Sequence, residues 1–269
     1  MVDCATCPSG HALTQMGLDV SRWDHVVALA GNPNTGKSTV FNALTGLRQH
    51  TGNWPGKTVT RAEGGYTFDN RRYKLVDLPG TYSLLSASQD EEIARDFILF
   101  GQPDCTIVVT DATCLERNLN LVLQALEISD KIVVCVNLID EARRKGIDVD
   151  VGSLARDLGV PAIPTVARKS EGLPELISTV ADVISGRITT SPHRVRGNGA
   201  FQHAVNELLP LIEDAAPGLP NAPWVAMRLL DGDHRVRQAL LSGELAATPA
   251  RQRESIEQAP VLVSLEGAQ

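Results

Sequence analysis

A glycine-rich loop between an apolar strand and a helix limits most strongly what this chain can fold into. The loop runs Gly31-Asn-Pro-Asn-Thr-Gly36-Lys37-Ser38 and matches the pattern G-x-x-x-x-G-K-[ST]. Such a loop surrounds a phosphate with backbone N–H groups at a helix N-terminus. Lys37 is expected to reach the β- and γ-phosphates, and Ser38 to ligate Mg²⁺. The predicted phosphate-contacting residues are Gly31, Asn32, Pro33, Asn34, Thr35, Gly36, Lys37, Ser38 and Thr39.

Short apolar runs alternate with segments of helical periodicity up to about residue 185. This alternation predicts an α/β domain with a mostly parallel sheet and helices on both faces. The expected strands are 24–31, 65–69, 71–77, 105–110, 132–136 and 160–166, with 65–69 and 71–77 forming a hairpin. The expected helices are 37–46, 90–100, 115–128, 151–158 and 173–184.

The composition changes after residue 186. A polar segment with Pro and Gly, 187–199, is typical of a linker. Short helices are expected beyond it at 200–216, 224–230, 234–245 and 249–258, with one strand-like run at 261–265. The predicted organisation is an N-terminal tail (1–23), a nucleotide-binding domain (24–185), and a linker with a small all-α domain (186–269).

Charge and composition exclude several classes of protein. The 269 residues carry 25 Lys and Arg against 32 Asp and Glu, a net charge of -7, which disfavours a nucleic-acid-binding module. No apolar run approaches the ~18 residues that span a bilayer, and the N-terminus lacks a signal-peptide pattern. Five scattered Cys favour a reducing, cytosolic setting.

Two further motifs follow strands in the order found in nucleotide hydrolases. Asp77-Leu-Pro-Gly80 ends the strand 71–77; in such enzymes the Asp supports Mg²⁺, usually through water, and the Gly amide contacts the γ-phosphate. Asn137-Leu-Ile-Asp140 follows the strand 132–136. The Asp140 carboxylate can accept hydrogen bonds from guanine N1–H and N2–H, a donor pair that adenine lacks. Asn137 is expected to join the base-binding loop to the phosphate loop. The three motifs together predict a P-loop GTPase that binds GTP and GDP.

The polar segment 50–60 lies between these motifs and is expected to be a loop that orders around Mg²⁺ and the γ-phosphate. Thr51, Thr58 and Thr60 each offer a hydroxyl that could complete the metal site. The alternative for the other residues of this segment is an ordinary surface loop on which Trp54 packs.

The motifs together resemble the cytosolic G domain of FeoB, the bacterial ferrous-iron transport protein B, a family related to the Ras-like and translation-factor GTPases. The resemblance covers about residues 24–185 and rests on GNPNTGKSTVFNALTG, GNWPGKTVT, DLPGTYSL, NLID and VARKSEGL. It implies that Thr58 is the Mg²⁺ ligand of the first switch, that the second switch starts at Asp77, and that the helical segment favours bound GDP. The implied contacts outside the phosphate loop are Gly56, Lys57, Thr58, Val59, Thr60, Asp77, Leu78, Pro79, Gly80, Asn137, Leu138, Ile139, Asp140, Val166, Ala167 and Arg168.

The resemblance also implies activation by K⁺ held by Asn34, which would offset negative charge developing at the β–γ bridge. Ras-like enzymes place a Gln directly after the D-x-x-G glycine, whereas this chain has Thr81, which is too short to orient water in the same way. Hydrolysis is therefore expected to be slow, near the ~10⁻⁴ to 10⁻² s⁻¹ of unassisted switch GTPases. The expected catalytic groups are Asn34, Lys37, Thr58 and Gly80; Ser38, Thr58 and Asp77 would serve Mg²⁺.

One residue departs from the family pattern: the base-contacting loop, usually Ser-Ala-Arg-Lys, begins with Val166. Ala167 can still offer its N–H to guanine O6. Val166, however, contributes no hydroxyl, so weaker or altered GDP retention is expected, and a GDP dissociation rate unchanged by Val166→Ser would contradict it.

The resemblance further implies a membrane permease following residue 269, tethering this part to the cytoplasmic face of the inner membrane. The alternatives are a free-standing GTPase of ribosome assembly or RNA modification, and a signalling module read through its nucleotide state. The oligomeric state and any metal binding by Cys4, Cys7 and His11 stay open. Cys105, Cys114 and Cys135 are expected to be small core residues.

Overall fold

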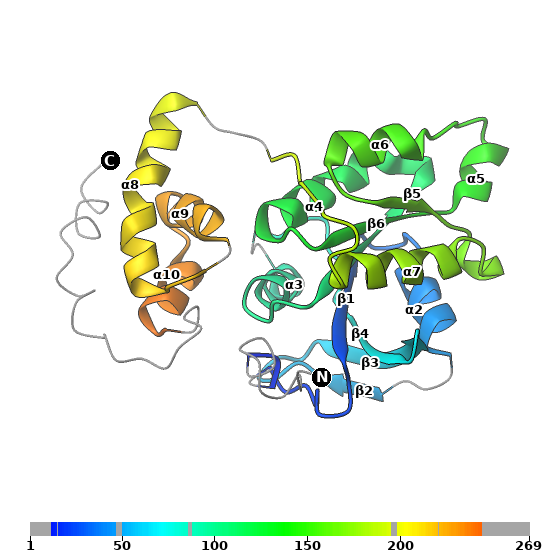
Figure 1. Ribbon diagram of the computed structural model, residues 1–269, viewed down its shortest axis with the longest axis horizontal. Coiled ribbons are helices and arrows are strands. Elements are labelled where there is room, and N and C mark those ends of the chain that lie inside the picture. Colours follow the sequence, from blue (N-terminus) through cyan, green and yellow to red (C-terminus); the bar gives the residue numbers. More distant parts are fainter. Residues whose placement is uncertain are drawn as a thin grey trace. The chain divides into compact units, whose positions relative to one another are not determined.

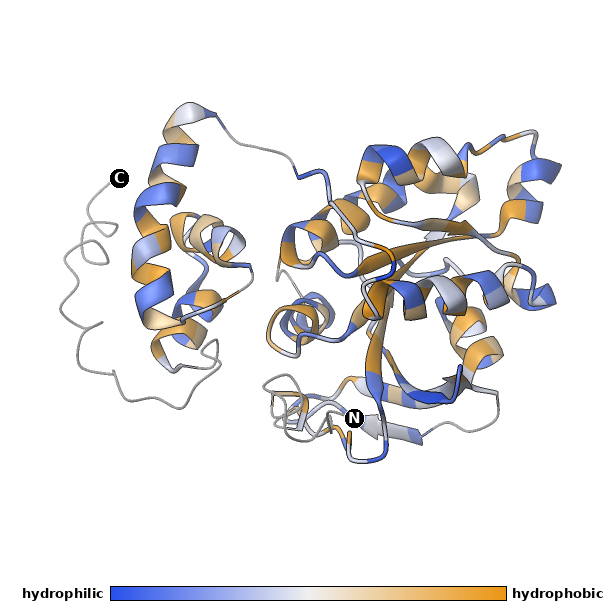
Figure 2. Ribbon diagram, viewed as in Figure 1, coloured by the Kyte–Doolittle hydropathy of each residue, from blue (hydrophilic) through white to orange (hydrophobic). Residues whose placement is uncertain are grey.

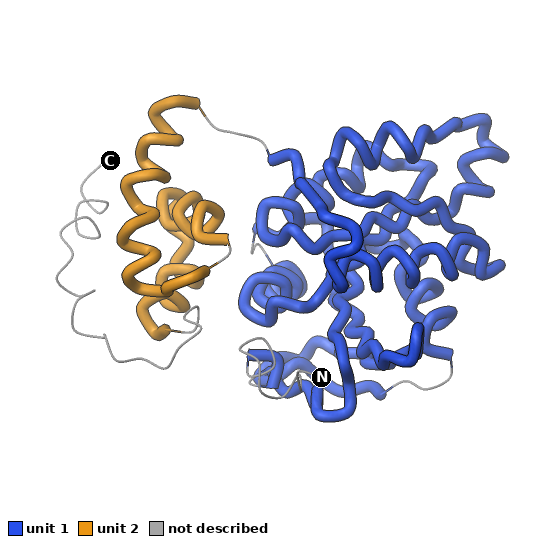
Figure 3. The backbone as a smooth tube through the Cα atoms, in the orientation of Figure 1, with its two compact units in different colours: residues 1–194 blue, residues 195–269 orange. Residues whose placement is uncertain are grey.

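The computed structural model describes residues 12–14, 16–46, 50–85, 88–194, 198–219 and 221–243. Two compact units make up the chain, Met1–Arg194 and Val195–Gln269 (Figure 3). The sequence places this division after residue 185. The structure places it later because 190–194 hydrogen-bond to the first unit: Ser191 N donates to Gly159 O (2.9 Å), and Arg194 Nε donates to Leu126 O (2.8 Å).

The first unit contains a seven-stranded sheet in the order β2-β3-β4-β1-β5-β6-β7 (Figure 1). β1 pairs in parallel with β4 and β5, and β6 in parallel with β5 and β7, whereas β3 is antiparallel to β2 and β4. The predicted α/β class with a mostly parallel sheet is confirmed. The strands are β1 (His25–Gly31), β2 (His50–Asn53), β3 (Thr60–Phe68), β4 (Arg71–Asp77), β5 (Cys105–Asp111), β6 (Ile132–Asn137) and β7 (Ala162–Pro164).

Helices cover both faces of this sheet (Figure 1). The α-helices are α2 (Lys37–Thr45), α3 (Gln89–Leu99), α4 (Leu115–Ile128), α5 (Ile139–Arg144), α6 (Val151–Leu158) and α7 (Leu173–Ile184), with short 3₁₀ turns η2 (Ala112–Cys114) and η3 (Ala167–Lys169). The predicted helices are confirmed to within a residue or two at their ends; α5 is an addition.

The core explains why the strand sequences are almost continuously apolar. Val27 and Leu29 of β1 pack with residues of α2 and α7, and all are buried. Figure 2 shows the central strands as the most hydrophobic part of this unit. Burying one such side chain stabilises the fold by about 1.5–3 kcal/mol, so a sheet covered on both faces selects Val, Ile and Leu.

The predicted hairpin is confirmed as β3–β4, joined by Asp69 and Asn70, whose φ values of 49° and 58° suit a tight two-residue turn. The expectation that 50–60 is only a loop is wrong in part, because His50–Asn53 forms β2 on β3. All four β2 residues are exposed, so backbone pairing holds this edge strand without an apolar alternation that sequence could reveal.

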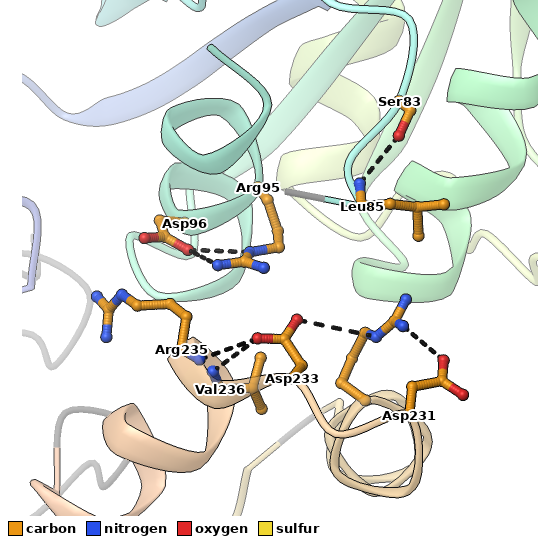
Figure 4. A network of polar contacts seen from close by, with 9 residues as sticks. Ser83, Leu85, Arg95, Asp96, Asp231, Asp233, Arg235 and Val236 are labelled. Atoms are coloured by element: carbon orange, nitrogen blue, oxygen red, sulfur yellow. Dashed lines mark hydrogen bonds and ion pairs between the residues drawn. The ribbon is translucent and has the colours of Figure 1, made fainter. Parts of the chain in front are cut away.

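The second unit is helical in its described part, with α8 (Gly199–Ala215), α9 (Ala222–Leu230) and α10 (His234–Leu241). Asp233 caps α10 by accepting hydrogen bonds from the backbone N–H groups of Arg235 and Val236 (Figure 4). The predicted helices at 200–216, 224–230 and 234–245 are confirmed to within two residues at their described ends. The expected helix 249–258 and the run 261–265 lie outside the described residues. Among the described helices, none has the length and apolar character needed to cross a membrane.

Candidate functional site

The glycine-rich loop lies between β1 and α2, as its pattern predicts. Asn34 (φ 68°) and Gly36 (φ 81°) adopt left-handed backbone conformations that bend the loop, and the Oγ1 of the buried Thr35 donates to Asn32 O (2.9 Å). A Cβ on Gly36 would overlap the Nδ2 of Asn137, so glycine is required by both conformation and space. The loop thus leads directly into the first turn of α2, where unpaired helical N–H groups favour an anion.

The second motif meets this loop through an ion pair. Lys37 Nζ donates a hydrogen bond to Asp77 Oδ1, and the two side chains are 11% and 17% exposed. Burial raises the pKa of the Asp77 carboxyl, and the Lys37 charge opposes that rise. Asp77 ends β4, the direct neighbour of β1, so parallel pairing brings the two motifs to one edge of the sheet.

Gly80 and Thr81 continue the second motif along the phosphate loop. An added Cβ on Gly80 would lie 3.5 Å from the Cα of Pro33, so the two backbones are close. Thr81 N donates to Gly31 O at 3.3 Å. The Thr81 side chain is buried and its Oγ1 donates to Ser83 O (2.8 Å). Its hydroxyl therefore stabilises the turn, which continues with a hydrogen bond from Leu85 N to Ser83 Oγ (Figure 4).

Asn137 joins the base loop to the phosphate loop. Its Nδ2 donates to Thr35 O (3.0 Å), and its Oδ1 accepts from Ala167 N (3.1 Å) and from Thr165 Oγ1 (3.3 Å). The side chain is buried. In this arrangement the Ala167 N–H, expected to face guanine O6, donates to Asn137. One amide at the end of β6 therefore links that strand end to the phosphate loop and to the segment that carries Thr165 and Ala167.

Asp140 lies in the first turn of α5, after Leu138 in a left-handed conformation (φ 62°). Its Oδ1 accepts from Glu141 N (3.0 Å), and its Oδ2 accepts from Arg168 Nη2 (2.5 Å). Although burial raises the pKa of Asp140, the hydrogen bond and charge of Arg168 outweigh it and hold the pKa below its ordinary value. Arg168 thus favours the ionised carboxylate, which has acceptor oxygens and no donor.

Val166 immediately precedes the η3 turn. Its side chain is buried, and its backbone N donates to Glu171 O (3.0 Å). The effect of this residue on nucleotide release stays a prediction.

The loop between β2 and β3 packs on α3. Trp54 is buried, makes an edge-to-face contact with Phe97 (5.5 Å between centroids), and lies under the Arg61 guanidinium (5.3 Å). Lys57 pairs with Glu92 of α3 at 2.6 Å. Sequence reasoning did not foresee the contacts with Phe97 and Glu92, which join residues 35 or more positions apart.

The three candidate hydroxyls of this segment are all exposed: Thr51, Thr58 and Thr60. Among the described residues, no hydrogen bond joins Thr58 to the phosphate loop. The structure therefore brings together the phosphate loop, Asp77, Gly80 and the base loops, whereas Thr58 lies on the segment held by α3. Its role as a metal ligand stays a prediction.

The cysteines separate into two groups. Cys105 and Cys135 are buried in the core as predicted, and burial raises the pKa of each thiol to about 12. The same expectation is wrong for Cys114, which is exposed because it ends the η2 turn at the surface. Cys4, Cys7 and His11 lie outside the described residues. Within the described ranges, no group of three or more His, Cys, Asp or Glu could hold a metal ion.

Comparisons with known proteins agree on one family. Residues 25–180 match the model of the N-terminal domain of ferrous iron transport protein B. The Fe(2+) transporter FeoB of Shigella flexneri is 37% identical over 86% of this chain and 30% of its own length. The chain therefore spans about a third of the curated relatives it matches.

Solved structures give the same result. The cytosolic domain of the T. maritima FeoB iron transporter in a GDP form is 33% identical, with a TM-score of 0.74 over 89% of this chain and 93% of that one. Its GMPPNP form gives the same identity and TM-score over 90% and 92%. With a family model covering more than half of its length and these relatives, this chain belongs to the FeoB family and contains its P-loop G domain.

Proposed function

We propose that this chain binds GTP and GDP with Mg²⁺, hydrolyses GTP slowly with activation by K⁺, and forms the cytosolic regulatory part of a ferrous-iron transporter. The observation that carries the proposal is the Asn137 side chain, which joins the phosphate loop at Thr35 to the base loop at Ala167. The GDP and GMPPNP forms of the T. maritima relative support it.

The phosphates would lie against the loop 31–38 and the first turn of α2. Lys37 lies at the end of the loop and pairs with Asp77 in the structure. When a nucleotide binds, its ammonium group can pair with a phosphate oxygen in place of Asp77. Ser38 and Asp77 supply the hard oxygen donors that suit Mg²⁺, with Thr58 as the proposed third group. Mg²⁺ neutralises charge on the β- and γ-phosphates when bound.

The base would be selected by Asp140. Guanine offers N1–H and N2–H to one carboxylate, whereas adenine leaves that carboxylate without donors. Asp140 is ionised at neutral pH, and the neighbouring Arg168 lowers its pKa further in the structure. Asn137 fixes the loop that carries Ala167, so the base is held at a set distance from the phosphates.

Hydrolysis would depend on positioning and electrostatics. The D-x-x-G motif is followed by Thr81, whose hydroxyl is occupied by Ser83 O, so this side chain does not orient the attacking water. The exposed Asn34, on the left-handed bend of the phosphate loop, carries an amide oxygen suited to K⁺. A cation there would offset charge at the β–γ bridge.

Steady-state GTP hydrolysis in Mg²⁺ with either K⁺ or Na⁺ tests the proposal. The wild-type chain is expected to be at least about tenfold faster in K⁺, and Asn34→Ala to remove the difference. Asn206→Ala, an exposed Asn on α8, serves as the matched control and should keep it. Equal wild-type rates in the two salts contradict K⁺ activation, and no GTP turnover in either salt contradicts the enzyme assignment.

The iron-transport part of the proposal rests on family membership, since this chain spans about 30% of the relatives' length. Growth on ferrous iron tests it. Asn137→Ala, introduced into the transporter that we propose contains this chain, is expected to abolish iron-dependent growth, whereas Asn206→Ala is not. Normal ferrous-iron uptake by the Asn137→Ala protein would contradict a regulatory role for this site.

A further inference from the structure

The Asp140 carboxylate, which we propose binds guanine, forms an ion pair with the Arg168 guanidinium in the structure. Arg168 Nη2 donates to Asp140 Oδ2 at 2.5 Å, and the backbone N of Glu141 donates to the other oxygen at 3.0 Å. Arg168 belongs to η3, the turn within the base loop that begins at Val166, and its side chain is about half exposed. A half-exposed side chain of η3 thus occupies an acceptor in the first turn of α5.

Arg168 and guanine present the same chemical group to this acceptor. The N1–C2–N2 edge of guanine is a guanidine fragment with two adjacent N–H donors, and the arginine guanidinium has the same planar fork. A carboxylate oxygen offers about two acceptor positions, and guanine needs one on each oxygen of Asp140. Arg168 already fills a position on Oδ2 and Glu141 N one on Oδ1, so guanine and Arg168 compete for Oδ2.

We propose that Arg168 competes with guanine for Asp140. Arg168 pairs with the carboxylate until the base displaces it, and Arg168 pairs with the carboxylate again as the base leaves. The inference rests on the proposed guanine-nucleotide function and adds a residue that sets affinity and release. It predicts that Arg168 weakens GDP binding and speeds GDP dissociation.

The displaced guanidinium has a second carboxylate within reach. Arg168 Nη1 lies 3.6 Å from Glu141 Oε1, so a small rotation exchanges one acidic partner for another. Displacement of Arg168 from Asp140 therefore leaves no unpaired guanidinium. The free energy needed for this displacement is thus small enough for nucleotide binding to supply it. Exposed ion pairs of this kind correspond to factors of about two- to fivefold in an equilibrium constant.

Lys169 provides a matched control. Its Nζ lies 4.0 Å from the same Asp140 Oδ2, and its side chain is 52% exposed against 51% for Arg168. Replacing either residue removes one positive charge from the same loop, but only Arg168 donates a hydrogen bond to the carboxylate. Any general effect of charge on a nucleotide phosphate is thus common to both variants.

Calorimetric titration with GDP tests the inference, together with stopped-flow measurement of GDP release. Arg168→Ala is expected to bind GDP about two- to fivefold more tightly than Lys169→Ala and to release it more slowly. The advantage should shrink in 1 M salt, which screens the competing ion pair. Arg168→Ala binding GDP no more tightly than Lys169→Ala overturns the inference.

A second background isolates the carboxylate. In Asp140→Asn the acceptor is neutral, so Arg168 has little to hold, and xanthosine diphosphate replaces GDP as the complementary ligand. Adding Arg168→Ala to this background is expected to leave xanthosine diphosphate affinity unchanged. An equal gain there overturns the competition mechanism, whereas failure of the wild-type chain to bind GDP at all overturns the proposed function itself.

Discussion

Replacing Asn137 with alanine removes the side chain that joins the phosphate loop to the base loop. Three hydrogen bonds are lost: Nδ2 to Thr35 O, Ala167 N to Oδ1, and Thr165 Oγ1 to Oδ1. The site is buried, so water does not readily replace the amide. The carbonyl of Thr35 and the N–H of Ala167 lose these bonds.

The expected loss of stability follows from these contacts. A net hydrogen bond contributes about 0.5–1.5 kcal/mol, and a buried polar group left unpaired costs about 1–3 kcal/mol. We therefore expect Asn137→Ala to lower the free energy of unfolding of the first unit by about 2–4 kcal/mol. Thr165→Val removes the longest of these three bonds, together with the 3.2 Å contact between Thr165 Oγ1 and Cys135 Sγ, and should cost about 1 kcal/mol.

Urea unfolding followed by tryptophan fluorescence measures this loss. A Trp224→Phe background confines the signal to Trp23 and Trp54, both in the first unit. GDP affinity, measured by calorimetry, should fall more than about tenfold in Asn137→Ala, since the two loops are no longer held together. A stability change below about 0.5 kcal/mol with unchanged GDP affinity would refute the reasoning, because it would mean that the link is dispensable.

Two further predictions concern the first unit. Burial lowers the pKa of His25 below its ordinary 6.5 despite the nearby Asp104, so the unfolded chain binds the proton more readily than the folded chain. The stability present above pH 6.5 is therefore lost as the pH falls through the folded pKa. His25→Gln should lose less stability than the wild-type chain between pH 7 and pH 5, and an equal loss contradicts this. A Cβ on Gly65 would overlap the ring of Trp23, so Gly65→Ala should lower the free energy of unfolding in urea by about 1–3 kcal/mol. A Cβ on Gly52 would meet no atom within 4 Å, so Gly52→Ala should lower it little. Equal losses for the two variants contradict this.

The parts of the site that could be predicted from sequence are those tied to the ends of strands. The phosphate loop, Asp77 and Asn137 each follow an apolar run, and parallel pairing of β4, β1, β5 and β6 places strand ends at one edge. Local pattern therefore determines their positions along the chain, and topology brings them together.

The features that could not be predicted depend on contacts between distant segments. β2 forms by backbone pairing of exposed residues, which leaves no hydrophobic alternation. The Arg168–Asp140 pair joins residues 28 positions apart, on η3 and α5, whose approach depends on the whole sheet. Trp54 is buried because α3 supplies Phe97, and no local signal distinguishes it from a tryptophan on a surface loop. Cys114 follows an apolar strand yet is exposed, because a 3₁₀ turn intervenes.

The measurement that tests the central claim most directly is the affinity of the wild-type chain for GDP compared with ADP, by calorimetry in Mg²⁺. The two ligands share their phosphates and ribose, so the comparison isolates the base and its contact with Asp140. We expect GDP to bind at least about 100-fold more tightly, because only guanine offers this carboxylate two N–H donors. Equal affinities, or no binding of either nucleotide, would contradict the assignment of a guanine-nucleotide site.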